Sequence, residues 1–244
     1  MKILVVIPAY NESRRLPALL DGIKARLGRP EAAGVQFLVV DDGGGPEEAG
    51  RLAALIAERG LGEFIKLLEL PENRGKGGAL KAGFARGLRE GFDWLGFMDA
   101  DGAVSAASLF EAIAYVKARA GTELAAVAGS RVNMLGRSIS RNPLRHYAGR
   151  AFATFVSLYF GVAMYDSQCG LKLFRADALA KYLELPTDFR WVWDTELVLA
   201  MLHGGETVHE LPIDWREVEG SKVSLLRDPA VMAARLIAFK RRLP

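Results

Sequence analysis

Closely spaced acidic residues on predicted turns are the strongest chemical signal in this sequence of 244 residues. Asp99-Ala100-Asp101 directly follows the apolar segment Trp94–Met98. Two carboxylates at this spacing on a turn can share one hard divalent cation that also holds a diphosphate. Oxygen ligands favour Mg²⁺ or Mn²⁺. Asp-x-Asp alone is common in turns, but its place at a strand end leads us to expect that Asp99 and Asp101 bind a metal.

A second acidic pair, Asp41-Asp42, ends the apolar segment 35–40. A carboxylate there can accept hydrogen bonds from a base N–H group or a ribose hydroxyl. Tyr10 offers a face for the base, or is simply an aromatic residue on the rim. A third polar turn, residues 73–78, places Lys76 among glycines at an expected helix start. Its backbone N–H groups and the lysine could meet a phosphate.

Two common nucleotide-binding motifs are absent from the sequence. No Gly-x-x-x-x-Gly-Lys-Ser/Thr segment marks a Walker A loop, and no Gly-x-Gly-x-x-Gly turn follows the first apolar run. The second absence counts against a dinucleotide-dependent dehydrogenase. No glycine-rich, arginine-containing loop follows that run either, which makes a nucleotidyltransferase a weaker alternative.

Short buried strands alternating with helices must position these residues. The expected strands are residues 3–7, 35–40, 63–70 and 94–98. The expected helices are residues 13–28, with Ser13 as N-cap and Gly28 at the end, residues 46–60, and residues 76–90. Such alternation predicts an α/β fold with a mainly parallel sheet, in which ligands bind beyond the carboxyl ends of the strands.

Composition indicates one sizeable core, since 50% of the residues are hydrophobic and 25% are charged. We expect a single domain, 1–244, with functional halves 1–102 and 103–244. The formal net charge of +3 gives no argument for a nucleic-acid partner. Its distribution is more informative, because residues 129–150 contain arginines and no acid. These are Arg131, Arg137, Arg141, Arg145 and Arg150. Such a patch favours phosphates or an anionic membrane surface, or it is a solvated basic face.

The single cysteine, Cys169, excludes an internal disulfide and suits a reducing compartment. We expect it to be a packing residue rather than a nucleophile. The apolar run 3–7 is too short for the core of a signal peptide. The longest apolar stretch, residues 151–164, is shorter than the roughly 20 residues that cross a bilayer. We therefore expect a chain that does not span a membrane, although it can touch one.

These motifs together resemble the successive blocks of family 2 inverting glycosyltransferases of the GT-A fold. The blocks of the first half are Val6-Ile7-Pro8-Ala9-Tyr10-Asn11-Glu12, Val39-Val40-Asp41-Asp42-Gly43, Asn73-Arg74-Gly75-Lys76-Gly77-Gly78-Ala79 and Asp99-Ala100-Asp101-Gly102. In the second half, the blocks resemble the dolichyl-phosphate β-glucosyltransferase branch. They are Gly129-Ser130-Arg131, residues 166–174, Trp193-Asp194-Thr195-Glu196-Leu197 and Gly220-Ser221-Lys222-Val223. The Gln-Cys-Gly-x-Lys and Gly-Ser-Lys blocks are the specific ones, and the resemblance covers residues 3–225.

The resemblance implies a UDP-sugar donor, most often UDP-glucose, and a polyprenyl phosphate acceptor at the cytoplasmic face of a membrane. By position, the residues that would line the nucleoside pocket are Pro8, Tyr10, Glu12, Asp41 and Asp42. Asp99 and Asp101 would hold the metal and the diphosphate, with Ala100 between them. Arg131 would face the acceptor phosphate, and Asp194 would lie near the sugar.

The sequence departs from the family pattern in two places. The usual Asp-Asp-Gly-Ser-x-Asp-Gly-Thr reads Asp-Asp-Gly-Gly-Gly-Pro-Glu-Glu here, so the loop after Asp42 can hold the donor differently. The N-terminal membrane anchor of the eukaryotic members has no counterpart in this sequence, which leaves the mode of membrane attachment open.

An ionised phosphate is already a nucleophile near neutral pH, so transfer to it requires no strong general base. Arginine suits the screening of two approaching anions, because its guanidinium binds phosphate bidentately. A metal stabilises the leaving diphosphate. One in-line displacement would then invert the anomeric carbon, and we expect Asp194 to orient the sugar, with base catalysis as its second possible role.

Two other functions remain open from the sequence. A family 2 transferase with a hydroxyl acceptor would use Asp194 as the base. A non-catalytic sugar- or lipid-binding protein is a remote alternative, permitted by the altered Gly44-Gly45-Pro46 segment.

Two apolar stripes are candidates for membrane contact. In a helix expected from Asp228-Pro229, the stripe consists of Met232, Leu236, Phe239 and Leu243, with Arg235, Lys240, Arg241 and Arg242 as the accompanying charges. The other stripe consists of Phe152, Phe155, Val156, Tyr159 and Phe160. We expect the first to bind an anionic bilayer as a basic amphipathic helix. The second is as well explained by core packing.

Overall fold

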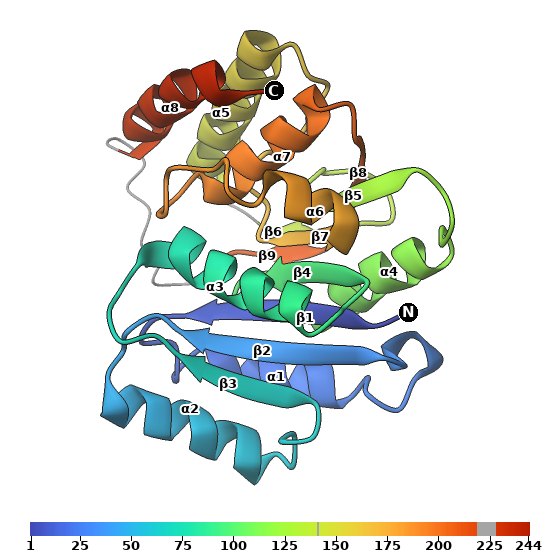
Figure 1. The fold of residues 1–244 in the computed structure, drawn as a ribbon, viewed down its shortest axis with the longest axis vertical. Coiled ribbons are helices and arrows are strands. Elements are labelled where there is room, and N and C mark those ends of the chain that lie inside the picture. The colour runs from blue at the N-terminus through green and yellow to red at the C-terminus, as the bar shows by residue number, and fades with distance from the viewer. Residues whose placement is uncertain (141, 219–227) are drawn as a thin grey trace.

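The computed structural model describes residues 1–140, 142–218 and 228–244. Within them, a central sheet of seven strands has the order β3-β2-β1-β4-β7-β5-β8 (Figure 1). The strands are β1 Ile3–Ala9, β2 Val35–Asp41, β3 Ile65–Glu69, β4 Trp94–Met98, β5 Leu124–Ser130, β7 Leu171–Arg175 and β8 Thr207–Pro212. Of these, β7 alone runs antiparallel to its neighbours, β4 and β5. The predicted α/β class with a mainly parallel sheet is confirmed.

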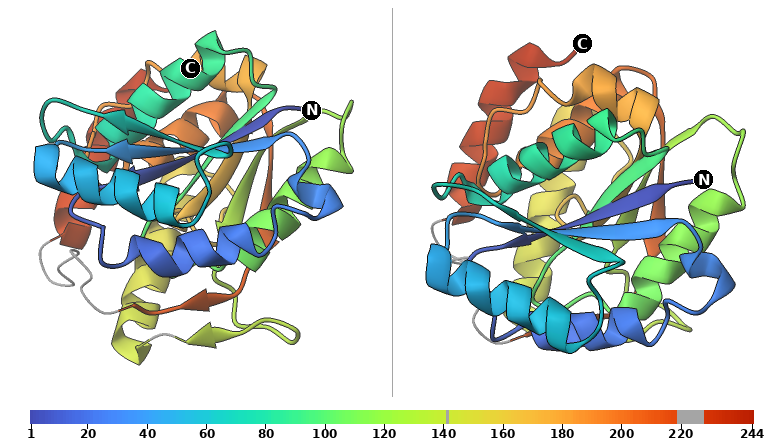
Figure 2. Two further views of the ribbon diagram at one scale, coloured as in Figure 1. Left: turned by 90° about the horizontal axis from the view of Figure 1, so that it is seen from below. Right: turned by 60° about the horizontal axis from the view of Figure 1, so that its bottom comes forward.

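Helices cover both faces of the sheet. They are α1 Leu16–Lys24, α2 Pro46–Glu58, α3 Gly75–Arg89, α4 Ala106–Lys117, α5 Pro143–Phe160, α6 Ala176–Tyr182, α7 Trp193–His203 and α8 Asp228–Phe239. Helices α1, α2 and α4 lie on one face, and α3, α6 and α7 on the other (Figure 2). A separate pair of short parallel strands, β6 Ile139–Ser140 and β9 Trp215–Arg216, joins the segment before α5 to the segment after β8.

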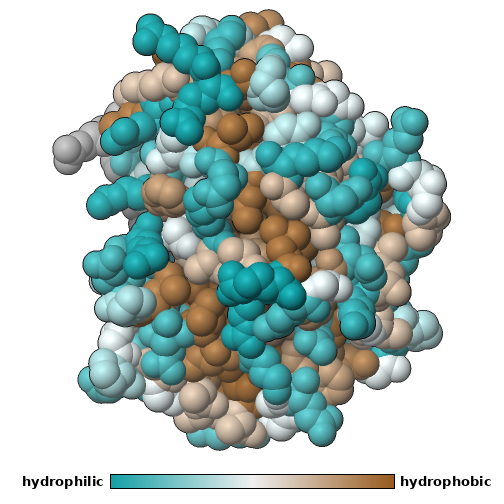
Figure 3. All heavy atoms as spheres, in the orientation of Figure 1, coloured by the Kyte–Doolittle hydropathy of each residue, from teal (hydrophilic) through white to brown (hydrophobic). Residues whose placement is uncertain are grey.

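The two faces of the sheet carry two separate hydrophobic cores. Successive side chains of β1 alternate between them: Ile3, Val5 and Ile7 belong to one core, and Leu4 and Val6 to the other. A strand covered on both faces reads as a continuous apolar run, which is why β1 was recognisable from sequence. On the outer face seen in Figure 3, hydrophobic side chains form separate groups between hydrophilic ones.

The first helix is shorter than predicted. It begins at Leu16 and ends at Lys24, not at Gly28. Ser13 does not cap it, because its N–H and hydroxyl groups both donate to the carboxylate of Glu48, at 2.9 and 2.8 Å. The serine therefore ties the β1–α1 loop to α2. A local pattern of capping residues could not reveal a partner 35 positions away.

The predicted membrane-binding stripe of the C-terminal helix is wrong. Helix α8 begins at Asp228 as expected, but Met232, Leu236 and Phe239 are buried in the core shared with α5 and α7. Packing against a protein core and lying on a bilayer require the same apolar periodicity, so the sequence did not distinguish them. No helix in the described part of the chain is long and apolar enough to cross a membrane.

Candidate active site

The carboxyl ends of β1, β2, β4 and β5 meet at one edge of the sheet, where β7 begins. A cavity of about 570 Å³ opens at this edge. Every predicted site residue except Asp41 lines it. They are Pro8, Tyr10, Glu12, Asp42, Lys76, Asp99, Ala100, Asp101, Arg131 and Asp194. The topology thus brings residues from both halves of the chain to one cavity.

Lys76 lies among the acidic residues of this cavity. Its Nζ is 2.6 Å from Oδ1 of Asp99 and 4.8 Å from the centre of the Phe97 ring. Burial by itself would lower the pKa of Lys76, but the charges of Asp99 and Asp194 outweigh it, and the pKa is raised. Burial, and then the charge of Asp99, raises the pKa of Asp101. The carboxylates thus repel one another, and Lys76 offsets part of the repulsion.

Gly170, in the turn that precedes β7, leaves room for the carboxylate of Asp99. A Cβ atom at Gly170 would lie 2.2 Å from Oδ2 of Asp99, well inside van der Waals contact. The backbone N–H of Asp99 also donates to the carbonyl oxygen of Gly170, at 3.0 Å. The Gln-Cys-Gly block therefore holds the Asp-x-Asp turn in place. Gly77 has a comparable packing role in the lysine loop, because a Cβ there would lie 2.5 Å from Cβ of Trp193.

The two acids at the end of β2 have different surroundings. Asp42 lines the cavity, and its Oδ1 accepts a hydrogen bond of 2.8 Å from Arg74 N–H. Asp41 does not line it. Its Oδ1 accepts from Gly44 N–H, at 3.0 Å, within the loop that departs from the family pattern. Burial raises the pKa of both carboxyl groups.

Arg131 is bound to an acid of the same cavity. Its Nε and Nη2 donate to Oδ2 and Oδ1 of Asp166, at 2.6 and 2.8 Å. Its backbone N–H also donates to Oδ2 of Asp166. Although burial acts against both charges, their attraction raises the pKa of Arg131 and lowers that of Asp166. Two of the side-chain donor groups of Arg131 are therefore already engaged, which residue type and spacing could not indicate.

Two other arginines of the run pair with acids that the sequence did not indicate. Arg137 pairs with Glu111 at 2.7 Å, and Arg145 pairs with Glu217 at 3.1 Å. Arg141 lies outside the described residues, as does the Gly220-Ser221-Lys222-Val223 block. The acid-free stretch of sequence is thus partly neutralised by acids from distant segments.

A buried lysine holds Asp194. Lys172, which is fully buried, donates from Nζ to Oδ2 of Asp194 at 2.5 Å and to the carbonyl oxygens of Cys169 and Ser167 at 3.0 and 3.2 Å. Helix α7 begins at Trp193, so Asp194 stands in its first turn, where a negative charge is favourable. Lys172 fixes one oxygen of Asp194 at the cavity wall. Lys172 belongs to the Gln-Cys-Gly-x-Lys block, but its partner could not be inferred from the sequence.

Cys169 is a packing residue, as expected. It is fully buried in the hydrophobic core, and burial, followed by the charge of Asp166, raises the pKa of its thiol to about 12. The thiol is therefore protonated at neutral pH, which excludes an activated nucleophile.

The C-terminal half supplies a wall of mixed character. Arg145 and Arg190 line the cavity together with apolar side chains, which are Phe152, Trp191, Trp215 and Met232. Ser167 is buried at the same cavity, and its Oγ has no hydrogen-bond partner within the described residues. Sequence reasoning missed Arg190 and also Arg15, which lines the cavity and donates to Glu12 from Nε at 2.7 Å. The i,i+3 spacing of Glu12 and Arg15 could have indicated the role of Arg15.

This architecture is that of a GT-A glycosyltransferase. It is similar to a solved structure of glucosyl-3-phosphoglycerate synthase from Mycobacterium tuberculosis, which is in complex with Mn²⁺, UDP and phosphoglyceric acid. The TM-score is 0.67, the superposition covers 99% of this chain and 78% of that chain, and the sequences are 17% identical. It is also similar to the mannosyltransferase PcManGT from Pyrobaculum calidifontis in complex with GDP-Man and Mn²⁺. That superposition has a TM-score of 0.63 and covers 97% of this chain and 64% of that chain, at 18% sequence identity.

The chain belongs to glycosyl transferase family 2, whose family model matches residues 4–183. It is 29% identical to the dolichyl-phosphate beta-glucosyltransferase of Saccharomyces cerevisiae, over 97% of this chain and 73% of that protein. The protein of the same name from Drosophila melanogaster is 33% identical, over 92% and 70%. The chain is therefore a glycosyltransferase, as the motifs predicted.

Proposed function

We propose that this glycosyltransferase transfers a sugar, glucose by preference, from UDP-sugar to a polyprenyl phosphate of dolichyl type, with inversion. The observation that carries the proposal is the mixed wall of the cavity, which is lined by Arg145 and Arg190 as well as by Phe152 and Trp215. Such a wall suits a phosphate that continues into an apolar chain. The names of the yeast and fly relatives support the same acceptor and sugar.

The donor would bind at the ends of β1, β2 and β4. We assign Pro8, Tyr10, Glu12 and Asp42 to the nucleoside, since they line that part of the cavity. Asp41 is assigned an indirect role, as the acid that holds the loop after Asp42. Lys76 would approach the diphosphate, because its ammonium group already lies beside Asp99. The neighbour from Mycobacterium tuberculosis binds UDP, which supports a uridine nucleotide.

The residues present fit a divalent cation at Asp99 and Asp101. Burial and mutual repulsion oppose ionisation of Asp101, and a cation between the two carboxylates would relieve this cost. The described residues contain no cluster of three or more acids, histidines or cysteines that could hold a metal. Two carboxylates with substrate phosphates are a usual set for Mg²⁺ and suit Mn²⁺ as well. When bound, the metal would supply charge stabilisation to the leaving diphosphate.

On the acceptor side, the phosphate oxygen is the nucleophile and needs no base. Arg131 would meet the acceptor with the donor groups that Asp166 leaves unused, while Arg190 supplies a charge without a carboxylate partner in the described residues. These positive charges screen the approach of two anions, and displacement from the side opposite the leaving group gives a β-linked product from an α-linked donor.

Asp194 is assigned to orientation of the sugar. Its Oδ2 is bonded to the ammonium of Lys172, which fixes the carboxylate at the cavity wall. A phosphate acceptor would leave Asp194 this positioning role, whereas a hydroxyl acceptor would need it as a general base.

The test is incubation of the purified chain with a panel of nucleotide-sugars and Mn²⁺ or Mg²⁺, using short-chain polyprenyl phosphates as acceptors. The matched polyprenyl alcohols and soluble sugars are the control acceptors, and products are read by mass. We expect a glycosylated polyprenyl phosphate and no product from the alcohol. Transfer to hydroxyl acceptors without transfer to phosphate would refute the proposal and restore Asp194 as the base. Because the acceptor is a lipid, we also propose peripheral contact with the cytoplasmic face of a membrane.

A further inference from the structure

The outward face of α5 carries no charge. After Pro143, its exposed residues recur at the spacing of one helix face and are Leu144, Tyr147, Ala151, Thr154 and Leu158, here named the α5 face. Leu144, Tyr147 and Leu158 are 68%, 72% and 79% exposed. A helix on a protein surface normally presents charged residues to water and its apolar stripe to the core. Helix α5 already buries a stripe of its own, which consists of Ala153, Val156 and Phe160.

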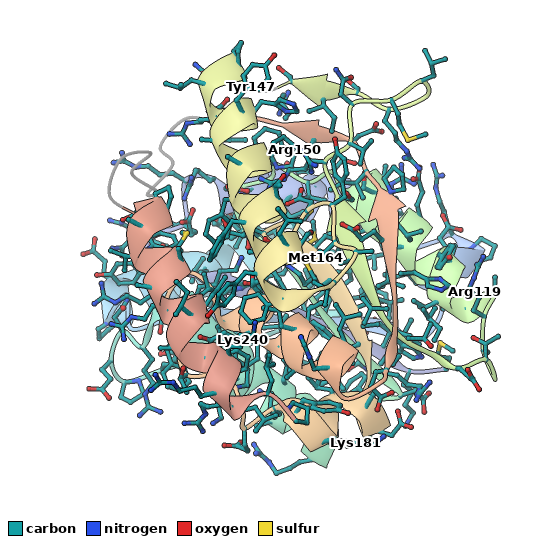
Figure 4. The ribbon with its side chains drawn as sticks, turned by 90° about the horizontal axis from the view of Figure 1, so that it is seen from above. Arg119, Tyr147, Arg150, Met164, Lys181 and Lys240 are labelled. Atoms are coloured by element: carbon teal, nitrogen blue, oxygen red, sulfur yellow. The ribbon has the colours of Figure 1, made fainter. Side chains whose placement is uncertain are left out.

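The positive charges around α5 lie at its margins. The guanidinium of Arg150 stacks on Tyr165, with 3.5 Å from its carbon to the ring centre, and Nη1 donates to the carbonyl oxygen of Tyr165. On the side of α8, Nζ of Lys240 donates to the carbonyl oxygen of Tyr159, at 2.7 Å. Figure 4 shows Tyr147, Arg150 and Lys240 along α5 and the adjoining end of α8. Neither cation pairs with a carboxylate within the described residues.

The same helix forms part of the cavity wall. Arg145, Ala148, Gly149 and Phe152 line the cavity, and the α5 face lies on another side of the same turns. A partner bound to this face would therefore lie next to the acceptor side of the cavity. A helix of 18 residues is about 27 Å long at 1.5 Å per residue, so the contact could be extensive.

We infer that the α5 face docks on the surface of an anionic bilayer, with α5 lying in the plane of the membrane. An uncharged stripe inserted among the headgroups, with a tyrosine on it and basic residues at its margins, is the arrangement of interfacial helices. The inference rests on the proposed function in one respect, since it explains how a lipid phosphate reaches the cavity while its chain stays in the bilayer.

Charge complementarity favours a bilayer over a second copy of this chain. In a symmetric dimer the two α5 faces would meet. Arg150 and Lys240 of one copy would then approach the basic residues of the other copy, and these like charges would repel. Helix α5 contains no acidic residue that could pair with them. Anionic lipid headgroups supply that countercharge.

The test is co-sedimentation of the full chain with phosphatidylcholine vesicles, with and without phosphatidylglycerol. The variant Leu144→Glu/Leu158→Glu places two like charges on the α5 face. The matched control is Val231→Glu/Ile237→Glu, which alters two exposed aliphatic residues of α8, 50% and 45% exposed. We expect the α5 variant to reduce partition onto anionic vesicles at least about tenfold and the control to change it less than about twofold. Added salt should weaken binding of the parent chain.

Three outcomes would overturn the inference. They are unchanged vesicle binding of the α5 variant, equal losses in both variants, or a shift from dimer to monomer in gel filtration without a change in vesicle binding. Both variants should keep the parent's melting temperature and its transfer to a short-chain polyprenyl phosphate in detergent. Absence of that transfer in the parent chain would refute the proposed function alone, because vesicle binding is measured without catalysis.

Discussion

Replacing Lys172 by methionine should destabilise the protein strongly, because it removes a buried ammonium and leaves its partners behind. The carboxylate of Asp194 would lose its 2.5 Å contact, and the carbonyl oxygens of Cys169 and Ser167 would lose a donor. Breaking a buried ion pair from one side costs about 3–5 kcal/mol. Asp194 lines the cavity, where water can reach it, so we expect the lower end, about 3 kcal/mol.

The assay is a double-mutant cycle with Lys172→Met, Asp194→Asn and the double variant, followed by denaturant and thermal unfolding. In a domain of this size, about 3 kcal/mol corresponds to a fall in Tm of roughly 6–12 °C. The double variant removes both charges, so it should be more stable than Lys172→Met alone. We expect a coupling free energy of about 2–3 kcal/mol between the two positions.

Additive effects of the two substitutions would refute this account of the pair. A second readout separates positioning from stability. Because Asp194 is assigned to the sugar, both Lys172→Met and the double variant should lower kcat at temperatures where they remain folded. Full kcat in the double variant would mean that the pair is structural only.

Four further substitutions test the geometry and the charges of the cavity. Gly170→Ala puts a methyl group 2.2 Å from Oδ2 of Asp99, so activity and Mn²⁺ affinity should fall about 100-fold in a metal titration, and unchanged affinity would contradict the packing argument. Asp101→Asn should lower activity by about 100-fold or more, as EDTA should in the parent. The Asp101→Asn substitution should nevertheless raise the Tm of the metal-free chain. The pKa of Asp101 is raised in the folded protein, so its ionised carboxylate destabilises the fold at neutral pH, and a lower Tm in the variant would contradict this. Arg131→Lys should raise acceptor KM with little change in donor affinity, whereas a collapse of donor affinity would move Arg131 to the donor site. Since the pKa of Asp166 is lowered in the folded protein, its ion pair with Arg131 stabilises the fold above about pH 4. The difference in Tm between the parent and the Asp166→Asn variant should therefore become smaller as the pH falls below that value.

The elements of the first half could be predicted because their signals are local. Buried parallel strands read as apolar runs, and their carboxyl ends share an edge, so the clustering of Tyr10, Asp42 and Asp99 followed from topology. The antiparallel insertion of β7 was not predicted. It depends on pairing between segments far apart in the sequence, and no local pattern encodes strand order.

Partners of the charged residues were the part that sequence could not supply. The run from Arg131 to Arg150 contains no acid, yet Asp166, Glu111 and Glu217 reach it from other elements. The Lys172–Asp194 pair likewise joins β7 to α7. Side-chain pairing across elements follows from the three-dimensional arrangement, whereas residue type and spacing report only on the same element.

The reversed strand β7 has a consequence for the order of assembly. It lies between β4 and β5, so β5 reaches the strands of the first half only through it. During synthesis, β1 to β4 can pair among themselves from contacts close in sequence, while β5 must wait until residues 171–175 have emerged. The turn that leads into β7 carries Asp166, the partner of Arg131, and Gly170, the neighbour of Asp99. A chain interrupted before this turn would therefore lack a contact on each side of the cavity, namely the ion pair of Arg131 and the support of Asp99.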